Sequence, residues 1–389
     1  MNNRRSQLVL LGAGLGHLQV LRDWSQRLHK GVELTVITPS PQPTYSPGLS
    51  AWVNGECQAS DINIALEPWI KACGARWIQD RCIGLDVHAR TIQLRNEPER
   101  LLHFDWLSIN TGSSMGLQQL EDLLPGAKGR VLPVRPVEQF MDYWARALET
   151  AKQRPMAVGV IGAGAAGVEL ALALKRRLSD VKAQASVSLI AGDEHWLAAP
   201  GSRARRLAER ALQQAHIQVL HQKCTQVGDG ELCLDNGMRL ACDLPIVTTG
   251  SMAPPWLRNS GLALDAHGYV AVNAHQQSTS HLRVFALGDV ATRVDRPHAK
   301  NAAYALHAGQ QHAQTLWAAI QGLDLKPIPT PRRLLQFMNT SDGRATVQWG
   351  DSCINAGWVL RWKRSRDEAQ LAALRHTAEA LPPPSTAAD

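Results

Sequence analysis

Short, mostly apolar runs recur along this chain, and several of them end directly in glycine or threonine. Residues 8–11, 158–161 and 284–287 are examples, and residues 34–37 and 187–190 follow the first two after a helical stretch. Apolar runs of four to six residues bounded by turn residues are typical of strands buried on both faces of a parallel sheet. The pattern therefore predicts an α/β protein built on parallel sheets.

Glycine-rich turns follow two of these runs at once. The first is Gly12-Ala13-Gly14-Leu15-Gly16-His17, and the second is Gly162-Ala163-Gly164-Ala165-Ala166-Gly167. In such a strand–turn–helix unit the first glycine permits the tight turn, the second lets the backbone approach a pyrophosphate, and the third lets the helix pack closely on the strand. The second copy matches this pattern in full. The first departs from it, with Gly16 one position early and His17 at the end.

A second signal follows each glycine turn at a similar distance. Thr111-Gly112-Ser113 ends the run 107–109, and Thr249-Gly250-Ser251 ends the run 246–248. Each pair of signals indicates one Rossmann-like fold, and the helix N-terminus after each glycine turn offers free N–H groups to phosphates. Two nucleotide-binding folds imply two nucleotides, and so electron transfer between them.

Neither fold carries the acidic residue that often binds the ribose hydroxyls at the end of the second strand. The first such strand ends at Thr38, and the second leads into Ala191-Gly192, with Asp193 close by. Ribose recognition in the first fold is left to Thr38 or to backbone, and the choice between NADH and NADPH stays open. Basic residues that could meet a 2′-phosphate, or form a solvated helix face, are Arg203, Arg205 and Arg206.

The second fold is predicted to be inserted in the first. Residues 1–130 form the first part of an FAD-binding domain, 131–262 an NAD(P)H-binding domain, and 263–325 the second part of the FAD-binding domain. A proline-rich linker then leads to a C-terminal region, residues 326–389, with a strand pair, a helix and a tail expected to be disordered.

Composition narrows the class of protein and the kinds of site to expect. The chain has 389 residues, a net charge of +7 and seven scattered cysteines without a C-x-x-C, which signals neither a dithiol redox centre nor a zinc site. No run approaches the roughly 20 apolar residues of a membrane-spanning helix, and the N-terminus leaves no room for a signal peptide, so the cytoplasm is the expected compartment. No nucleic-acid motif accompanies the positive charge, so nucleic acid is not expected as a partner.

Taken in order, these motifs resemble the two-dinucleotide-binding-domain flavoproteins of the type II NADH dehydrogenase branch. The likeness is greatest to the NADH-dehydrogenase-like module found fused to selenophosphate synthetase, although no synthetase domain is present here. It rests on Gly16-His17, on Thr44-Tyr45-Ser46-Pro47-Gly48, on the helix start at residues 300–305, and on the strand and turn at residues 337–345. The resemblance implies hydride transfer from NADH or NADPH to FAD and reoxidation by a second acceptor.

The resemblance also assigns site residues. It places Tyr45, His17 and Lys300 around FAD, with Lys300 beside the pyrimidine edge of the flavin, where a positive charge stabilises the reduced anion. Glu169 would lie near the nicotinamide. As alternatives, Tyr45 could only pack its loop, Asp289 could be a turn residue, and Glu169 and Lys300 could be solvated charges. The FAD contacts implied are Gly12, Gly14, Gly16, Thr111, Gly112, Gly288 and Asp289, and those for NAD(P)H are Gly162, Gly164, Gly167, Thr249 and Gly250.

The C-terminal segment favours a quinone as the acceptor. Ile354, Trp358 and Trp362 recur every four residues and are expected to share a helix face, and basic residues are interleaved with them. This composition is typical of a helix lying on anionic lipid, so peripheral association with the inner face of the cell membrane is expected. The alternative is a helix that packs its tryptophans on the core. The basic residues concerned are Arg361, Lys363, Arg364 and Arg366.

Three other functions remain open. A sulfide:quinone oxidoreductase would resemble this scaffold but needs a mid-chain cysteine beside the flavin, and none lies between Cys82 and Cys224. A soluble reductase for a protein acceptor and a non-enzymatic redox sensor are the other two, and a homodimer is compatible with each. Truncation after about Gly350 is expected to weaken binding to vesicles and to leave reduction of small acceptors intact.

Overall fold

A computed structural model describes residues 5–26, 29–114, 117–192, 202–248, 252–298, 300–331 and 334–375. Its first five-stranded sheet is parallel throughout and has the order β3-β2-β1-β7-β17. The apolar run at residues 8–11 forms the centre of this sheet, with Leu8 beside Leu34 on one side and Leu10 beside Ser108 on the other. The strands are β1 (Ser6–Leu11), β2 (Val32–Ile37), β3 (Arg76–Ile78), β7 (Trp106–Ile109) and β17 (Val284–Ala286).

The second sheet repeats this arrangement in the order β11-β10-β9-β15-β8, again with every strand parallel. The repeated sequence signal is therefore a repeated fold, and the predicted fold class is confirmed. The copies differ at the fifth strand, which follows its neighbour in the chain in the first sheet and precedes the whole sheet in the second. The strands are β8 (Leu132–Pro133), β9 (Met156–Ile161), β10 (Ala185–Ile190), β11 (Gln218–Leu220) and β15 (Leu244–Val247).

Each copy also carries a three-stranded antiparallel meander between its third strand and its fourth. One meander has β4 (Cys82–Asp86), β5 (Thr91–Leu94) and β6 (Leu101–His103). The other has β12 (Cys224–Val227), β13 (Glu231–Leu234) and β14 (Arg239–Ala241). A short parallel pair, β16 (Val270–Val272) and β18 (Ala291–Arg293), leads the chain back to the first sheet.

Helices cover the sheets. In the first fold, α1 packs against α9. These helices approach so closely that a Cβ on Gly309 of α9 would lie 2.7 Å from the Cα of Gly16. Gly16 therefore serves close packing in place of the last glycine of the fingerprint. The helices are α1 (Leu15–Ser25), α2 (Leu49–Val53), α3 (Ala59–Ile62), α4 (Glu67–Ala72), α5 (Leu117–Leu123), α6 (Val137–Ala151), α7 (Ala165–Asp180), α8 (Arg203–Gln214), α9 (Ala302–Ile320) and α10 (Gly357–Leu374).

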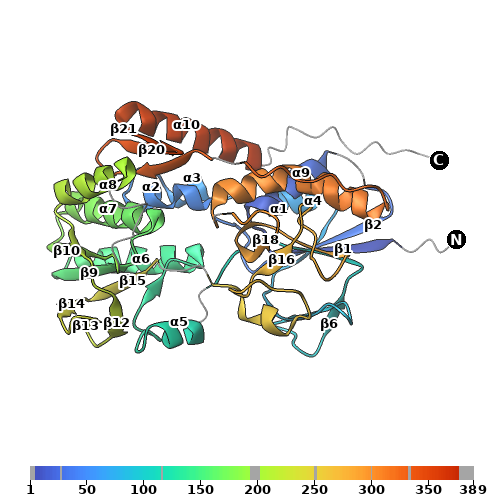
Figure 1. The fold of residues 1–389 in the computed structure, drawn as a ribbon, viewed down its shortest axis with the longest axis horizontal. Coiled ribbons are helices and arrows are strands. Elements are labelled where there is room, and N and C mark those ends of the chain that lie inside the picture. Colours follow the sequence, from blue (N-terminus) through green and yellow to red (C-terminus); the bar gives the residue numbers. More distant parts are fainter. Residues whose placement is uncertain are drawn as a thin grey trace.

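The C-terminal region is a three-stranded antiparallel sheet followed by α10, and it rests on both folds (Figure 1). Its strands are β19 (Gln336–Asn339), β20 (Ala345–Trp349) and β21 (Ser352–Ala356). The sequence predicted a strand pair, and it placed Ile354 on a helix with the tryptophans. Both points are wrong, because a third strand contains Ile354 and the helix begins only at Gly357. Leu371 and Leu374 of α10 join the core of the first fold, whereas Met338 of β19 joins that of the second.

Candidate functional site

A cavity of about 580 Å³ begins at the N-terminus of α1 and is lined by Gly12, Gly14, Thr111, Gly112 and Asp289. Gly12 has a φ of +89°, and a Cβ there would lie 2.6 Å from the carbonyl oxygen of Asn110. Gly112 also has a positive φ and has no atom within 4 Å of its Cβ position. The glycines therefore form a cradle that side chains would fill.

This cradle fits the pyrophosphate of a dinucleotide. The N-cap of α1 is Gly14, which has no side chain to cap the helix. The His17 N–H donates to Asn110 Oδ1 at 3.1 Å, so the N–H groups of Leu15 and Gly16 and the positive end of the helix dipole remain for an anion. The cavity extends past Thr38 to Arg81 and Arg95 at one end and to Asp289 at the other. FAD is the cofactor that this elongated site would hold.

An ion pair between Asp289 and Arg135 closes the inner end of the cavity. The Asp289 side chain is 9% exposed and accepts a hydrogen bond from Nη1 of Arg135, which also donates to Ser113 Oγ at 2.9 Å. Asp289 follows Gly288, whose φ is +73°, in a 3-10 turn after β17. Arg135 was missed in the sequence because the Pro133-Val134-Arg135-Pro136 segment indicated only a boundary.

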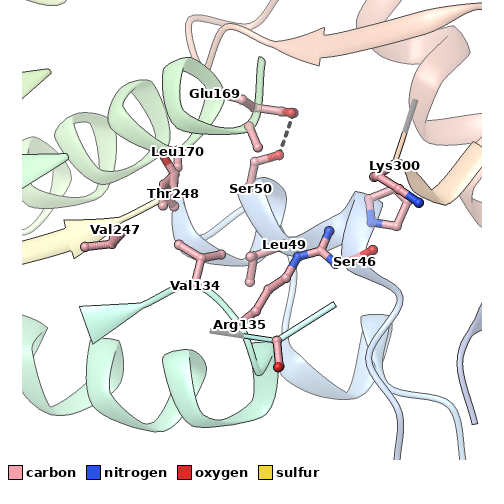
Figure 2. Close-up of a pocket in the computed structure, with 13 residues that line it drawn as sticks. Ser46, Leu49, Ser50, Val134, Arg135, Glu169, Leu170, Val247, Thr248 and Lys300 are labelled. Atoms are coloured by element: carbon pink, nitrogen blue, oxygen red, sulfur yellow. Dashed lines mark hydrogen bonds between the residues drawn. The ribbon is translucent and has the colours of Figure 1, made fainter. Parts of the chain in front are cut away.

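A smaller cavity of about 250 Å³ lies between the two folds and takes residues from both. Ser46, Ser50 and Lys300 come from the first fold, and Glu169 and Thr248 come from the second (Figure 2). Arg135 and Ser114 line both cavities. The two cavities therefore adjoin along this shared wall.

Glu169 is not a solvated helix residue. Its Oε1 accepts hydrogen bonds from Ser50 Oγ at 2.7 Å and from the backbone N–H of Asn339 at 2.9 Å, as Figure 2 shows for the first of these. Burial raises the pKa of this carboxyl group, and the nearby charge of Lys363 opposes that effect. Glu169 thus ties α7, α2 and β19 together at the cavity.

Lys300 is likewise not a surface charge. Its Nζ donates to the carbonyl oxygen of Ala291 and to Thr292 Oγ1, and it lies 4.0 Å from the ring centroid of Tyr269. Burial lowers the pKa of this amine to about 8, although Asp265 and Asp289 favour the charged form. Lys300 therefore brings a cation with little hydration to the smaller cavity.

In the second glycine turn one glycine is required by close packing and another borders open space. A Cβ on Gly167 would lie 1.9 Å from the carbonyl oxygen of Gly162, whereas the Cβ position of Gly164 has no atom within 4 Å. Thr248 Oγ1 donates to that same Gly162 oxygen at 2.9 Å. Thr249 and Gly250 lie outside the described residues.

Two residues predicted to contact FAD do not line the larger cavity. Tyr45 is buried, and its hydroxyl donates to Asp367 Oδ1 of α10 at 3.0 Å; its neighbours Thr44 and Ser46 line the larger cavity, but Tyr45 does not. His17 is fully buried beneath the first glycine turn. The alternative that Tyr45 packs its loop therefore describes its position.

The C-terminal helix contributes a lysine that the sequence grouped with the surface charges. Lys363 is 7% exposed, and its Nζ donates to the Pro47 carbonyl oxygen at 3.1 Å and to Asp367 Oδ2 at 2.7 Å. Arg364 pairs with Glu56 at 2.8 Å. The expectation of four lipid-facing basic residues is therefore wrong, because Lys363 is buried, whereas Arg364 stays exposed beside Glu56. Lys363 instead supports the Ser46–Gly48 turn at the smaller cavity.

Two Rossmann-like folds with adjoining nucleotide sites define a two-nucleotide flavoprotein. The chain belongs to the pyridine nucleotide-disulphide oxidoreductase family, which it matches over residues 6–311. It is 26% identical over 341 residues to the demethylphylloquinone reductase NdbB of Synechocystis sp., covering 84% of this chain and 83% of that protein. It is 23% identical to the alternative NAD(P)H-ubiquinone oxidoreductase C1 of Arabidopsis thaliana, covering 84% and 70%.

Solved structures show the same fold. NDH2 from Plasmodium falciparum, in complex with NADH, superposes with a TM-score of 0.76 at 12% identity and covers 95% of this chain and 97% of its own. The sulfide:quinone oxidoreductase from Aquifex aeolicus gives 0.76 at 16% identity, covering 95% and 91%. The predicted class, an FAD-dependent NAD(P)H dehydrogenase, is confirmed by the family and its named relatives. Within the described ranges, no helix is long and apolar enough to cross a bilayer.

Proposed function

We propose that this protein passes electrons from NAD(P)H through FAD to a quinone. The observation that carries the proposal is the smaller cavity, in which Glu169 and Thr248 of the second fold face Ser46 and Lys300 of the first. A nicotinamide and a flavin ring would meet there. The names of the relatives from Synechocystis and Arabidopsis, a demethylphylloquinone reductase and an NAD(P)H-ubiquinone oxidoreductase, support a quinone as the acceptor.

Charged side chains of the protein line this cavity and would orient the two cofactors there. Bound FAD supplies the redox chemistry, and the protein supplies orientation and electrostatics. Lys300 places a positive charge where negative charge develops on reduction, and Arg135 holds Asp289 at the junction of the two cavities. Glu169, which lines the smaller cavity, holds α2 and β19 against α7 through its hydrogen bonds with Ser50 and Asn339. Hydride transfer between the two cofactors requires no protein nucleophile.

Purified protein is expected to be yellow and to reduce quinones at the expense of NAD(P)H. FAD should bind without a covalent link, because glycine backbone and Asp289 are its expected contacts, and it should give an absorption band near about 450 nm. The measurement is the spectrum of the protein, followed by a screen of quinone analogues, ferricyanide and protein acceptors, with NADH, NADPH and sulfide each tested as the electron donor.

The outcomes separate the candidate functions. Turnover with quinone analogues supports the proposal. Turnover with a protein acceptor alone indicates a soluble reductase, and reduction without turnover indicates a sensor. A sulfide-dependent reaction is not expected, because the described lining of the smaller cavity contains no cysteine and Cys353 is buried in β21. Colourless protein that FAD cannot reconstitute would contradict the proposal.

An exposed aromatic patch is the surface through which we expect a quinone-bearing membrane to be met. Trp358 and Trp362 are 49% and 38% exposed and stack with ring centroids 6.4 Å apart, while Trp349 and Ile354 on the neighbouring strands are also exposed. Arg361 and Arg366 are exposed on the same helix. The opposite face of α10, with Val359, Leu360 and Leu371, is buried. One face of the helix therefore belongs to the core, and the other carries the exposed aromatic patch.

The double substitution Trp358→Ser and Trp362→Ser is expected to weaken binding to anionic vesicles and to spare reduction of a water-soluble quinone analogue. Interfacial tryptophans bury apolar area in the headgroup region, and each nearby arginine adds only about 1 kcal/mol. Vesicle co-sedimentation measures the first effect, and steady-state kinetics measure the second. Tyr143→Ser removes an aromatic side chain of similar exposure on α6 and serves as the control. Unchanged vesicle binding by the double variant would show that this patch does not meet lipid.

A further inference from the structure

The histidine that ends the first glycine fingerprint lies at the centre of a buried hydrogen-bonded chain. His17 and His312 are both 0% exposed. His17 Nδ1 lies 2.5 Å from the Gly12 carbonyl oxygen, and its Nε2 lies 2.8 Å from Ser108 Oγ. Ser108 Oγ in turn lies 2.8 Å from Nε2 of His312. This series of hydrogen bonds therefore connects the turn after β1 to Ser108 on β7, and Ser108 to His312 on α9.

The direction of each hydrogen bond follows from the donor and acceptor chemistry. A carbonyl oxygen only accepts, so Nδ1 of His17 carries the proton and Nε2 must accept from the Ser108 hydroxyl. Ser108 Oγ then accepts from Nε2–H of His312. Within the described structure, Nδ1 of His312 has no hydrogen-bond partner, as suits a neutral ring whose second nitrogen is an acceptor. Burial lowers the pKa of His17 to about 4 and that of His312 to about 3, so both rings are neutral at physiological pH.

In the second fold a threonine donates the hydrogen bond that His17 donates in the first. Its first glycine, Gly162, also has a carbonyl oxygen that accepts a side-chain hydrogen bond, there from Thr248 Oγ1. The residue at the matching position of the first fold is Asn110, whose Nδ2 is already used by the Leu287 carbonyl oxygen. His17 occupies the position that matches Gly167, and its ring supplies the donor that Asn110 does not.

We propose that His17 is a positioning residue for FAD, and that Ser108 and His312 reinforce the tautomer that the Gly12 carbonyl oxygen sets. By donating to the Gly12 carbonyl oxygen, His17 holds the negative end of that peptide away from the cavity. In a planar trans peptide the N–H points opposite to the C=O, so the N–H of Ala13 then faces the cavity that Ala13 lines, without a competing carbonyl. The departure from the glycine pattern is thus a replacement of one hydrogen-bond donor by another.

The test compares two substitutions that differ in one hydrogen bond. His17→Asn keeps an N–H near the position of Nδ1, whereas His17→Leu removes it and leaves the Gly12 carbonyl without its partner. The Gly12 carbonyl oxygen of His17→Leu is then free to turn toward the pyrophosphate, so the Kd for FAD, measured by flavin fluorescence, should rise by roughly ten-fold or more. His17→Asn should stay within about three-fold of the original chain, a loss of under 1 kcal/mol. Titration with NADH reports whether the second fold is intact.

Ring nitrogen NMR of the holoprotein gives a readout that packing alone does not move. His17 should show the neutral Nδ1–H tautomer, and His312→Leu, which removes the donor to Ser108 Oγ, should reduce that preference and weaken FAD binding. Thr315→Val, at a buried site one turn along α9, is the control and should change neither. Equal FAD affinity in His17→Asn and His17→Leu, or an Nε2–H tautomer at His17, would overturn the proposal. If His17→Leu does not fold, the tautomer and the His17→Asn and His312→Leu affinities still decide it.

Discussion

Replacing Gly164 with leucine is expected to abolish reduction by NAD(P)H while FAD remains bound. Gly164 has an ordinary helical-start φ of −64°, and its Cβ position has no atom within 4 Å. A larger side chain therefore disturbs no neighbour and projects into the space where the backbone must approach a pyrophosphate. Stopped-flow reduction of the flavin by NADH and NADPH should fall by at least about 100-fold, which corresponds to roughly 2.7 kcal/mol of lost binding.

Two substitutions show whether this effect is local. Gly164→Ala adds only one methyl group to open space and should reduce the rate far less than leucine does. Gly14→Leu, at the equivalent position of the first fold, should lose FAD, because its Cβ alone would lie 2.5 Å from Asn110 Oδ1. Loss of flavin from Gly164→Leu with nicotinamide binding intact would mean that the two folds have been assigned in the wrong order.

Removal of residues 351–389 is expected to destabilise the protein and to impair reduction of every acceptor. The sequence alone predicted that small acceptors would still be reduced, but α10 buries Val359, Leu360, Leu371 and Leu374. Each such side chain stabilises the fold by roughly 1.5–3 kcal/mol, so their loss is comparable to the total stability of a typical domain. Thermal unfolding followed by flavin release measures the effect.

A point substitution separates the role of α10 in the site from its role in the core. Lys363→Met keeps the buried stem and removes the hydrogen bond to the Pro47 carbonyl oxygen, so the turn at residues 46–48 loses its anchor. We expect a higher KM for NAD(P)H with FAD retained. Arg361→Met, an exposed position on the same helix, is the matched control.

A full-length level of ferricyanide reduction by the truncated chain would show that α10 is dispensable for the site.

The sequence predicted those features that depend on local pattern. Apolar runs, glycine turns and the Gly288-Asp289 turn are each encoded within a few residues. The runs lie in the sheets, and Gly12, Gly14 and Asp289 line the larger cavity. The positions of Lys363 and Arg135 could not be predicted in this way. Whether a lysine on a helix faces solvent or the interior depends on the partner surface, and the partners of Lys363 are a carbonyl group and an aspartate that only the packed structure brings into reach.

Helical spacing misled the interpretation of Ile354 for a related reason. A spacing of four residues fits one helix face, but Ile354 lies on a strand that pairs with β20, with Val347 as its direct neighbour. The turn at Gly350 and the start of α10 at Gly357 leave room for a five-residue strand between them. Tertiary pairing therefore decided what periodicity alone could not.

The position of β17 at the edge of the first sheet has a consequence for biosynthesis. The chain leaves the ribosome N-terminus first, and every strand of the second sheet is made before β17 emerges. The nicotinamide fold can therefore close while the first sheet still lacks its edge strand, Asp289 and the α9 partner of His17. Flavin capture is therefore expected to follow synthesis of the whole second sheet.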